Sequence, residues 1–238
     1  MRQTTPPKTK ATTIRIPSSV FLFYRYYMNL AEKKRSLISE LRDNGVLRTP
    51  AIIHAFEAVP RERFVLPDHR EHAYANEPLP LLEGQTISQP LTIAAMLEAL
   101  EPRLSNIILE VGAGSGYVAA LLSAIVGSKG KVIAVERLHT LAEFARKNLS
   151  GYKNVRVIEA DGSGGYPDAA PYDAILVSAA APDVPGPLVA QLKEGGRLVV
   201  TVRDELYKIT KQPDGVVKQF LGHYAFVPLR GKHGYASR

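Results

Sequence analysis

Residues 107–117 read Ile-Ile-Leu-Glu-Val-Gly-Ala-Gly-Ser-Gly-Tyr, an apolar run that leads into three glycines and the start of a helix. The apolar residues predict a buried strand over Ile107–Val111. Glycines at such a turn let the backbone bend tightly and let a ligand approach main-chain atoms without a Cβ in the way. The dinucleotide spacing G-x-G-x-x-G is not met, because Tyr117 occupies its final position. The pattern is E-x-G-x-G-x-G instead, with Glu110 near the strand end.

Glu110 favours a cationic ligand at this turn over a pyrophosphate. A helix N-terminus already attracts a phosphate group and has no need of a carboxylate beside it. S-adenosylmethionine carries a sulfonium and an ammonium group, so the acidic form of the turn suits it. A glycine turn with a purely structural role is the alternative interpretation of this segment taken alone.

Two further acidic residues follow the next predicted strands. Glu136 closes the predicted strand 131–136, 24 residues after Gly112, where a doubly wound sheet presents a carboxylate to ribose hydroxyls. Asp161-Gly162 follows the third strand, where an acceptor can meet the exocyclic amine of adenine. The alternatives are a solvated carboxylate at a helix start for Glu136 and a turn-forming Asp-Gly pair for Asp161. Acids at the carboxyl ends of three successive strands predict one ligand crevice.

Strands and helices alternate from Gln89 onward, and this alternation predicts a parallel sheet with helices on both faces. The predicted fold class is therefore α/β, a doubly wound Rossmann-like sheet with a helical N-terminal segment and a C-terminal β-hairpin. The strands are predicted at 107–111, 131–136, 155–159, 173–177 and 196–202, and the helices up to 99 and at 115–126, 140–149 and 185–192.

The flanking segments carry signals of their own. Apolar residues at helical spacing predict a helix over Ala31–Asn44 that Gly45 ends, and Thr49-Pro50 predicts the start of a second helix. Pro213-Asp214-Gly215 separates two β-like runs and predicts the terminal hairpin. We expect a leader over residues 1–30 and a single domain over 31–238. Within that domain we expect N-terminal helices at 31–83, a cofactor-binding core at 84–203 and C-terminal strands at 204–238.

The formal net charge of +7 comes from the start of the chain. Residues 1–48 hold 10 Lys or Arg and 3 Asp or Glu, whereas residues 49–238 hold 20 of each. A footprint for nucleic acid is expected near an active site, so nucleic acid is not an expected partner. The leader is interpreted as a solvated arm, an anchor for an acidic partner or a weak RNA contact. Residues 1–13 are predicted to be disordered, and the aromatic run 18–30 is expected to pack on the domain or on another subunit.

The sequence contains no cysteine, which excludes disulfides, thiolate catalysis and cysteine-ligated metal, and we expect no metal cofactor. No apolar run approaches the roughly 18 to 20 residues that span a bilayer, and no secretory signal is evident. We therefore expect a cytoplasmic protein without a membrane partner. Monomer and homo-oligomer both remain open at this point.

Other segments resemble a known family. Gly84-Gln85-Thr86-Ile87-Ser88-Gln89-Pro90 resembles the signature of the protein-L-isoaspartate (D-aspartate) O-methyltransferases, which lies shortly before the glycine turn. The similarity covers about residues 35–232 and includes 60–65, 74–80, 161–163, 178–182, 192–196 and 226–229. Many methyltransferases share the glycine turn, whereas the 84–90 segment is specific to this family. The resemblance implies a class I S-adenosylmethionine-dependent methyltransferase fold.

The resemblance also implies an activity and a set of site residues. The family repairs damaged proteins and peptides by transferring a methyl group from S-adenosyl-L-methionine to the α-carboxyl of L-isoaspartyl residues, and D-aspartyl residues are a further possible substrate. The products are a methyl ester and S-adenosyl-L-homocysteine. Ser88 is implied as the active-site serine. The implied substrate-binding residues are Gln85, Thr86, Ile87, Ser88, Phe226, Val227, Pro228 and Leu229. The implied cofactor contacts are Glu110, Gly112, Ala113, Gly114, Ser115, Gly116, Glu136, Asp161 and Gly162.

This reaction explains why no catalytic base is evident in the sequence. The nucleophile is a carboxylate that is already ionised at neutral pH, so catalysis rests on orientation and on the exclusion of water. We hypothesise that the Ser88 hydroxyl and nearby backbone N–H groups hold this carboxylate. On local sequence grounds alone, Ser88 is a predicted helix N-cap before Gln89-Pro90, and this role is compatible with an active-site role.

Two other functions compete with this interpretation. One is a nucleic-acid methyltransferase with the same cofactor fold, which the basic leader favours. Base methylation often uses polar and aromatic residues after the fourth strand to hold an amine, whereas Ser178-Ala179-Ala180-Ala181 occupies that place here. The other is a non-catalytic relative that binds the cofactor or damaged proteins, which the intact glycines and acids disfavour.

Overall fold

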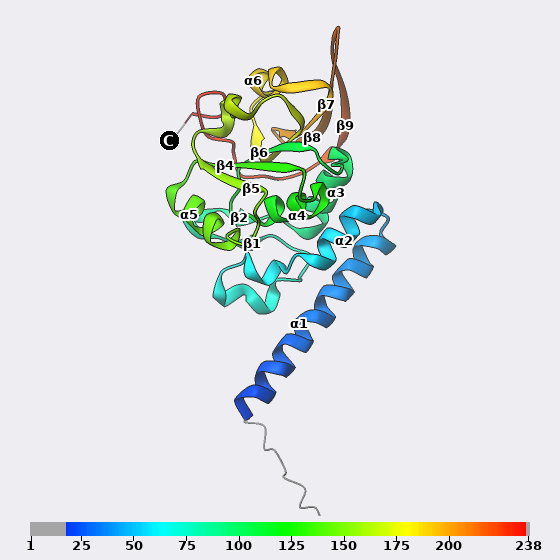
Figure 1. The fold of residues 1–238 in the computed structure, drawn as a ribbon, viewed down its shortest axis with the longest axis vertical. Helices are drawn as coiled ribbons and strands as arrows, with labels where there is room; N and C mark the ends of the chain where they lie inside the picture. The colour runs from blue at the N-terminus through cyan, green and yellow to red at the C-terminus, as the bar shows by residue number, and fades with distance from the viewer. Residues whose placement is uncertain (1–17, 237–238) are drawn as a thin grey trace, which may run out of the picture.

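The computed structural model describes residues 18–236, with side chains from Asn29 onward. A seven-stranded sheet in the order β5-β4-β3-β6-β7-β8-β9 forms its centre (Figure 1). The five strands from β5 to β7 run parallel, and β8 and β9 extend the sheet as an antiparallel hairpin. This arrangement confirms the predicted α/β fold and its C-terminal hairpin. The strands are β3 (Ile107–Val111), β4 (Lys131–Glu136), β5 (Val155–Glu159), β6 (Tyr172–Ala181), β7 (Leu192–Val202), β8 (Glu205–Gln212) and β9 (Gly215–His223).

Alternate residues of the central strands face two separate cores. Ile108 and Leu176 belong to the core on one face of the sheet, and Leu109 and Ile175 belong to the core on the other. Because both faces are covered, these strands are mostly apolar on both sides rather than alternating regularly with polar residues. The first face is covered by α3 (Pro90–Leu100), α4 (Tyr117–Val126) and α5 (His139–Asn148), and the second by α6 (Gly186–Ala190).

The register of the parallel strands brings their acidic ends to one edge of the sheet. Glu110 lies opposite Ala134 of β4 and Leu176 of β6. Glu136 lies at the end of β4, opposite Glu159 of β5. Parallel strands end at the same edge, and a crevice outside that edge is where such sheets bind ligands.

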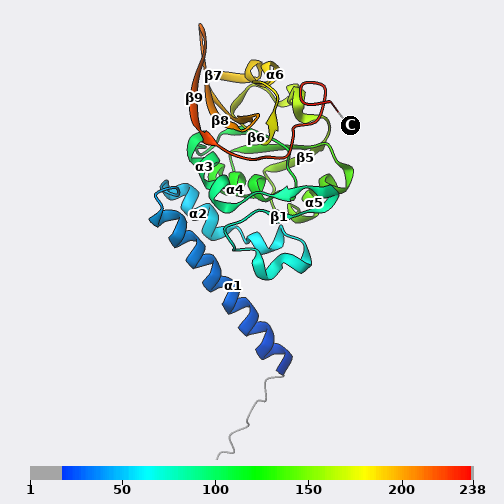
Figure 2. The ribbon, with the colours of Figure 1, turned by 180° about the vertical axis from the view of Figure 1, so that it is seen from behind.

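The N-terminal helix is longer than predicted. α1 spans Ser18–Asp43 rather than starting at Ala31, because residues 18–30 contain no glycine or proline that would interrupt a helix. Gly45 ends it as predicted, with a φ of 68°. In both ribbon views the N-terminal part of α1 extends away from the sheet (Figures 1 and 2). The predicted disorder of 1–13 lies outside the described residues, as do the side chains before Asn29 on which the predicted packing of 18–30 depends.

α2 (Pro50–Ala58) begins at the predicted residue but is held in an unexpected way. Thr49 occupies the N-cap position without capping its own helix. Its backbone N–H and its hydroxyl each donate to the carboxylate of Glu98 in α3 at 2.8 Å. Glu98 therefore joins the start of α2 to α3. Among residues 18–236, no helix is long and apolar enough to cross a membrane.

Short elements connect α2 to the sheet and shape the remaining loops. The connection between α2 and α3 contains a two-stranded antiparallel ladder, β1 (Leu79–Pro80) with β2 (Thr86–Ile87). Five short 3-10 helices complete the described chain, namely η1 (Arg61–Arg63), η2 (Pro67–His72), η3 (Leu82–Gly84), η4 (Gly162–Gly164) and η5 (Pro167–Ala169).

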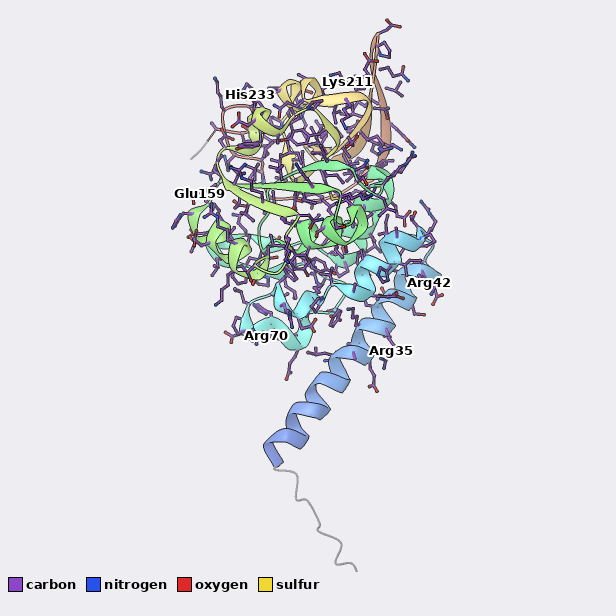
Figure 3. All side chains as sticks on the ribbon, in the orientation of Figure 1. Arg35, Arg42, Arg70, Glu159, Lys211 and His233 are labelled. Carbon is purple, nitrogen blue, oxygen red and sulfur yellow. The ribbon has the colours of Figure 1, made fainter. Side chains whose placement is uncertain are left out.

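The chain after β9 returns to the end of β6 (Figure 2). The Ala180 N–H donates to the Val227 carbonyl at 2.8 Å, and the Leu229 N–H donates to the Ala180 carbonyl at 2.7 Å. This pairing helps β6 to continue to Ala181, past its predicted end at residue 177. The loop beyond it, which carries His233, lies far from the exposed arginines Arg35 and Arg42 of α1 (Figure 3).

Candidate active site

A cavity of about 350 Å³ opens at the carboxyl edge of the central strands. Its walls come from the turn after β3, the end of β4, the segment before α3 and the segment after β9. The predicted site residues that line it are Gln85, Thr86, Ile87, Ser88, Glu110, Gly112, Ala113, Gly114, Ser115, Glu136, Gly162, Val227, Pro228 and Leu229. Gly116, Asp161 and Phe226 do not line it. One cavity therefore joins most of the predicted cofactor residues to most of the predicted substrate residues.

The glycine turn needs its glycines for conformation and for space. Gly112 and Gly116 have φ angles of 85° and 86°, in the left-handed region that other L-residues avoid. A Cβ at Gly116 would also lie 2.7 Å from Cδ1 of Leu149. The Gly114 N–H donates to Oε2 of Glu136 at 2.9 Å, so the end of β4 holds the turn that follows β3.

Glu110 and Glu136 place two buried carboxyl groups beside the same cavity. Glu110 is only 1% exposed and Glu136 only 7%. Oε2 of Glu110 has no hydrogen-bond partner among the described residues. Burial, and then the nearby Glu136 carboxylate, raise the pKa of Glu110 well above its usual value. A cationic ligand in the cavity would satisfy this group, so the residues fit the sulfonium and ammonium charges of S-adenosylmethionine.

Asp161 faces the C-terminal loop rather than the cavity. Its Oδ1 accepts from the Ser163 N–H at 2.9 Å, and its Oδ2 accepts from the Lys232 N–H at 2.7 Å. The neighbouring Gly162 does line the cavity and packs against Val111. Contact between Asp161 and an adenine ring stays a prediction, and the structure adds that this carboxylate anchors the loop after residue 230.

Ser88 is not the N-cap of α3, and that prediction is wrong. Pro90 is the first helical residue, as proline commonly is, so Gln89 takes the N-cap position and Ser88 lies outside the helix. Ser88 is half-buried and lines the cavity. Its carbonyl accepts from Nη2 of Arg61 at 2.9 Å. Within the described chain its hydroxyl makes no hydrogen bond, so it is available to a ligand.

Several cavity residues were missed in the sequence. Glu83, Arg137, Ser178 and Arg230 all line the cavity. Arg137 directly follows Glu136 and Ser178 follows the predicted end of a strand, so position after a parallel strand was a usable signal for both. Glu83 and Arg230 carry no comparable local signal, because the connection between β1 and β2 and the segment after β9 bring them to the cavity.

The parallel sheet, the glycine turn with its buried acids and the adjoining cavity define a class I S-adenosylmethionine-dependent methyltransferase. A family sequence profile identifies the group within this class. The profile described as Protein-L-isoaspartate(D-aspartate) O-methyltransferase matches residues 32–234, which include every predicted site residue. The chain belongs to the protein-L-isoaspartate(D-aspartate) O-methyltransferase family.

Individual relatives agree with this family. A protein-L-isoaspartate O-methyltransferase from Methanopyrus kandleri is 47% identical over 210 residues, which cover 85% of this chain and 93% of the relative. A solved protein-L-isoaspartate O-methyltransferase matches with a TM-score of 0.77 and 31% identity over 84% of this chain and 67% of that chain. A Plasmodium falciparum structure, described as this type of enzyme in complex with S-adenosyl-L-homocysteine, matches with a TM-score of 0.74 and 26% identity over 82% and 97% of the two chains.

Proposed function

We propose that this chain transfers the methyl group of S-adenosylmethionine to the α-carboxylate of L-isoaspartyl residues in damaged proteins and peptides. Family membership supports the reaction. The observation that carries the site assignment is that Ser88 and Glu110, from segments on either side of α3, line one cavity. The products would be a methyl ester and S-adenosylhomocysteine. D-aspartyl residues, which the family description includes, are a second substrate of the same chemistry.

The cofactor end of the cavity would be formed by Glu110, Glu136 and the turn over Gly112–Gly116. The unpartnered oxygen of Glu110 would accept hydrogen bonds from, or oppose the charge of, a cationic group. Both oxygens of Glu136 already accept backbone N–H groups, from Gly114 and Leu138, which fixes the carboxylate for further contacts with hydroxyl groups. When bound, the cofactor supplies a methyl group on a positively charged sulfur.

The substrate end would be formed by Gln85–Ser88 and Val227–Leu229. The Ser88 hydroxyl would donate to the substrate carboxylate and hold it for attack, and no proton has to be removed from the nucleophile. Val227 and Leu229 are tied to Ala180 by two backbone hydrogen bonds, so this wall of the cavity is held by the sheet. Orientation by these groups is the contribution that the chain itself makes to the reaction.

A methyl-transfer assay with three acceptors tests the reaction. Labelled S-adenosylmethionine is incubated with the protein and an isoaspartyl peptide, its aspartyl twin or bulk RNA. We expect base-labile label on the isoaspartyl peptide alone. Label on RNA would instead identify a nucleic-acid methyltransferase, and no label on any acceptor would support a non-catalytic binding protein.

Ser88→Ala tests the assigned role of the serine. Loss of a hydrogen bond to a charged group costs about 1–3 kcal/mol, so kcat/KM for the isoaspartyl peptide should fall about 5- to 150-fold. The affinity for S-adenosylhomocysteine should not change, and Ser150→Ala, at an exposed residue outside the cavity, serves as the matched control. Full kcat and KM in Ser88→Ala would show that the assignment is wrong.

A further inference from the structure

Arg61 is a buried arginine that does not line the cavity but contacts residues that do. The residue is 0% exposed and lies in η1, 27 residues before Ser88. Its Nε donates to the Ala73 carbonyl at 2.8 Å, and its Nη2 donates to the Ser88 carbonyl at 2.9 Å. Its Cζ lies 5.1 Å from the centroid of the Tyr117 ring, in a cation–π contact. Ser88 and Tyr117 both line the cavity, so one guanidinium joins its substrate and cofactor sides.

No carboxylate of the described residues forms an ion pair with Arg61. Its Nη1 is buried and has no hydrogen-bond partner among these residues. Burial lowers the pKa of Arg61 to about 10, which still leaves it protonated at neutral pH. A buried, unbalanced cation is costly, and an apolar side chain of similar volume would avoid that cost. The charge therefore calls for an anion that the described chain does not supply.

We propose that Arg61 is a positioning residue that makes the Ser88 end of the cavity selective for a carboxylate. Its hydrogen bond fixes the Ser88 backbone, and its positive charge favours an anionic group beside Ser88 over a neutral group of the same shape. Inside the protein this charge is weakly screened, so it acts across the Ser88 peptide and the Tyr117 ring without direct contact. The inference rests on the proposed function, because it takes the anion to be the substrate carboxylate that Ser88 holds.

A purely structural arginine would behave differently. If Arg61 only held the carbonyls of Ala73 and Ser88, its loss would loosen the Ser88 segment. The binding of charged and neutral peptides would then weaken by the same factor. If its charge selects the substrate, its loss weakens the carboxylate peptide and leaves a neutral analogue nearly unaffected. The two roles are therefore separated by the ratio of two affinities rather than by activity alone.

The experiment compares an isoaspartyl peptide with its twin that carries an α-carboxamide. The first is assayed for kcat and KM, and the second is assayed as a competitive inhibitor for its Ki. Both are measured for the wild type, Arg61→Met, which removes the charge, and Arg61→Lys, which keeps the charge but loses the planar fork. Arg63→Met, at an exposed arginine of the same short helix, is the matched control. The Kd for S-adenosylhomocysteine reports whether each variant is folded.

We expect the KM of the isoaspartyl peptide to rise about 10- to 100-fold in Arg61→Met, while the Ki of the carboxamide peptide changes by less than about threefold. Arg61→Lys should keep the preference for the carboxylate and lose kcat. Equal weakening of both peptides in Arg61→Met would overturn the inference, as would an unchanged preference. If Arg61→Met does not bind S-adenosylhomocysteine, Arg61→Lys decides, since a lost preference there contradicts a role for the charge and a kept one supports it.

The same measurements separate this inference from the proposed function. A wild-type protein that methylates no isoaspartyl peptide refutes the proposed function itself. A wild-type protein that methylates the peptide but binds the carboxamide twin equally well refutes only the role of Arg61.

Discussion

Glu110→Gln should stabilise the protein without ligand while weakening its hold on the cofactor. The substitution keeps the shape of the side chain and removes the charge of a carboxyl group that is 1% exposed, with one oxygen unpartnered in the described chain. An unsatisfied buried charged group costs at least about 1–3 kcal/mol, of which an amide in the same place recovers a part. We expect the free energy of unfolding to rise by about 1–2 kcal/mol. In a domain of this size that raises Tm by roughly 2–8 °C.

The stabilisation should depend on pH in a defined direction. The folded state raises the pKa of Glu110 above the value of 4.5 that an unperturbed carboxyl has, so the folded protein binds the proton more tightly than the unfolded chain does. Wild-type stability therefore falls as the pH rises from the unfolded pKa through the folded one. The difference between wild type and Glu110→Gln should be small near pH 4 and reach its full size above the folded pKa.

Ligand binding should change in the opposite sense. The ammonium group of S-adenosylhomocysteine loses an opposing charge, and a loss of about 1.4–2.8 kcal/mol raises Kd about 10- to 100-fold. Thermal unfolding with and without S-adenosylhomocysteine, together with calorimetric Kd values, measures both effects, and Glu77→Gln at an exposed position is the control. A lower Tm for the ligand-free variant at neutral pH, or a Kd within twofold of wild type, would refute the reasoning.

Two further substitutions test the turn and the sheet. Gly116→Ala should cost about 1–3 kcal/mol of unfolding free energy in urea, because φ is 86° and the new Cβ would lie 2.7 Å from Leu149, whereas Gly151→Ala meets no atom within 4 Å and should cost much less. Equal costs would contradict this account. Lys208→Met should raise the Glu101 pKa toward 4.5, since the hydrogen bond from Lys208 is the main cause that lowers it. Stability that comes from a lowered carboxyl pKa is lost as the pH falls through the pKa of the folded state, so the variant should lose less stability in acid. An unchanged Glu101 midpoint in an NMR titration would count against this.

Local sequence was enough to place the central elements and much of the cavity. The predicted bounds of β3, β4 and β5 agree with the structure, because each is a short run rich in β-branched residues that a glycine or an acid closes. The positions of Glu110 and Glu136 at one edge followed from the parallel topology, in which the carboxyl end of every strand faces the same way. Element type and strand-end chemistry are properties of a few neighbouring residues, so the sequence shows them directly.

Contacts between distant segments decided the rest. β6 reaches Ala181 because Thr201–Val202 and the segment after β9 pair with its last residues, and no residue near its predicted end reports that pairing. Arg61 carries no local signal for its position beside Ser88, and Asp161 accepts a hydrogen bond from Lys232, which follows it by 71 residues. The sequence by itself determined the glycine turn, the acids and the order of strands and helices. Only the tertiary structure decided which side chains meet, because such contacts depend on how the packed layers bring together segments that the sequence keeps apart.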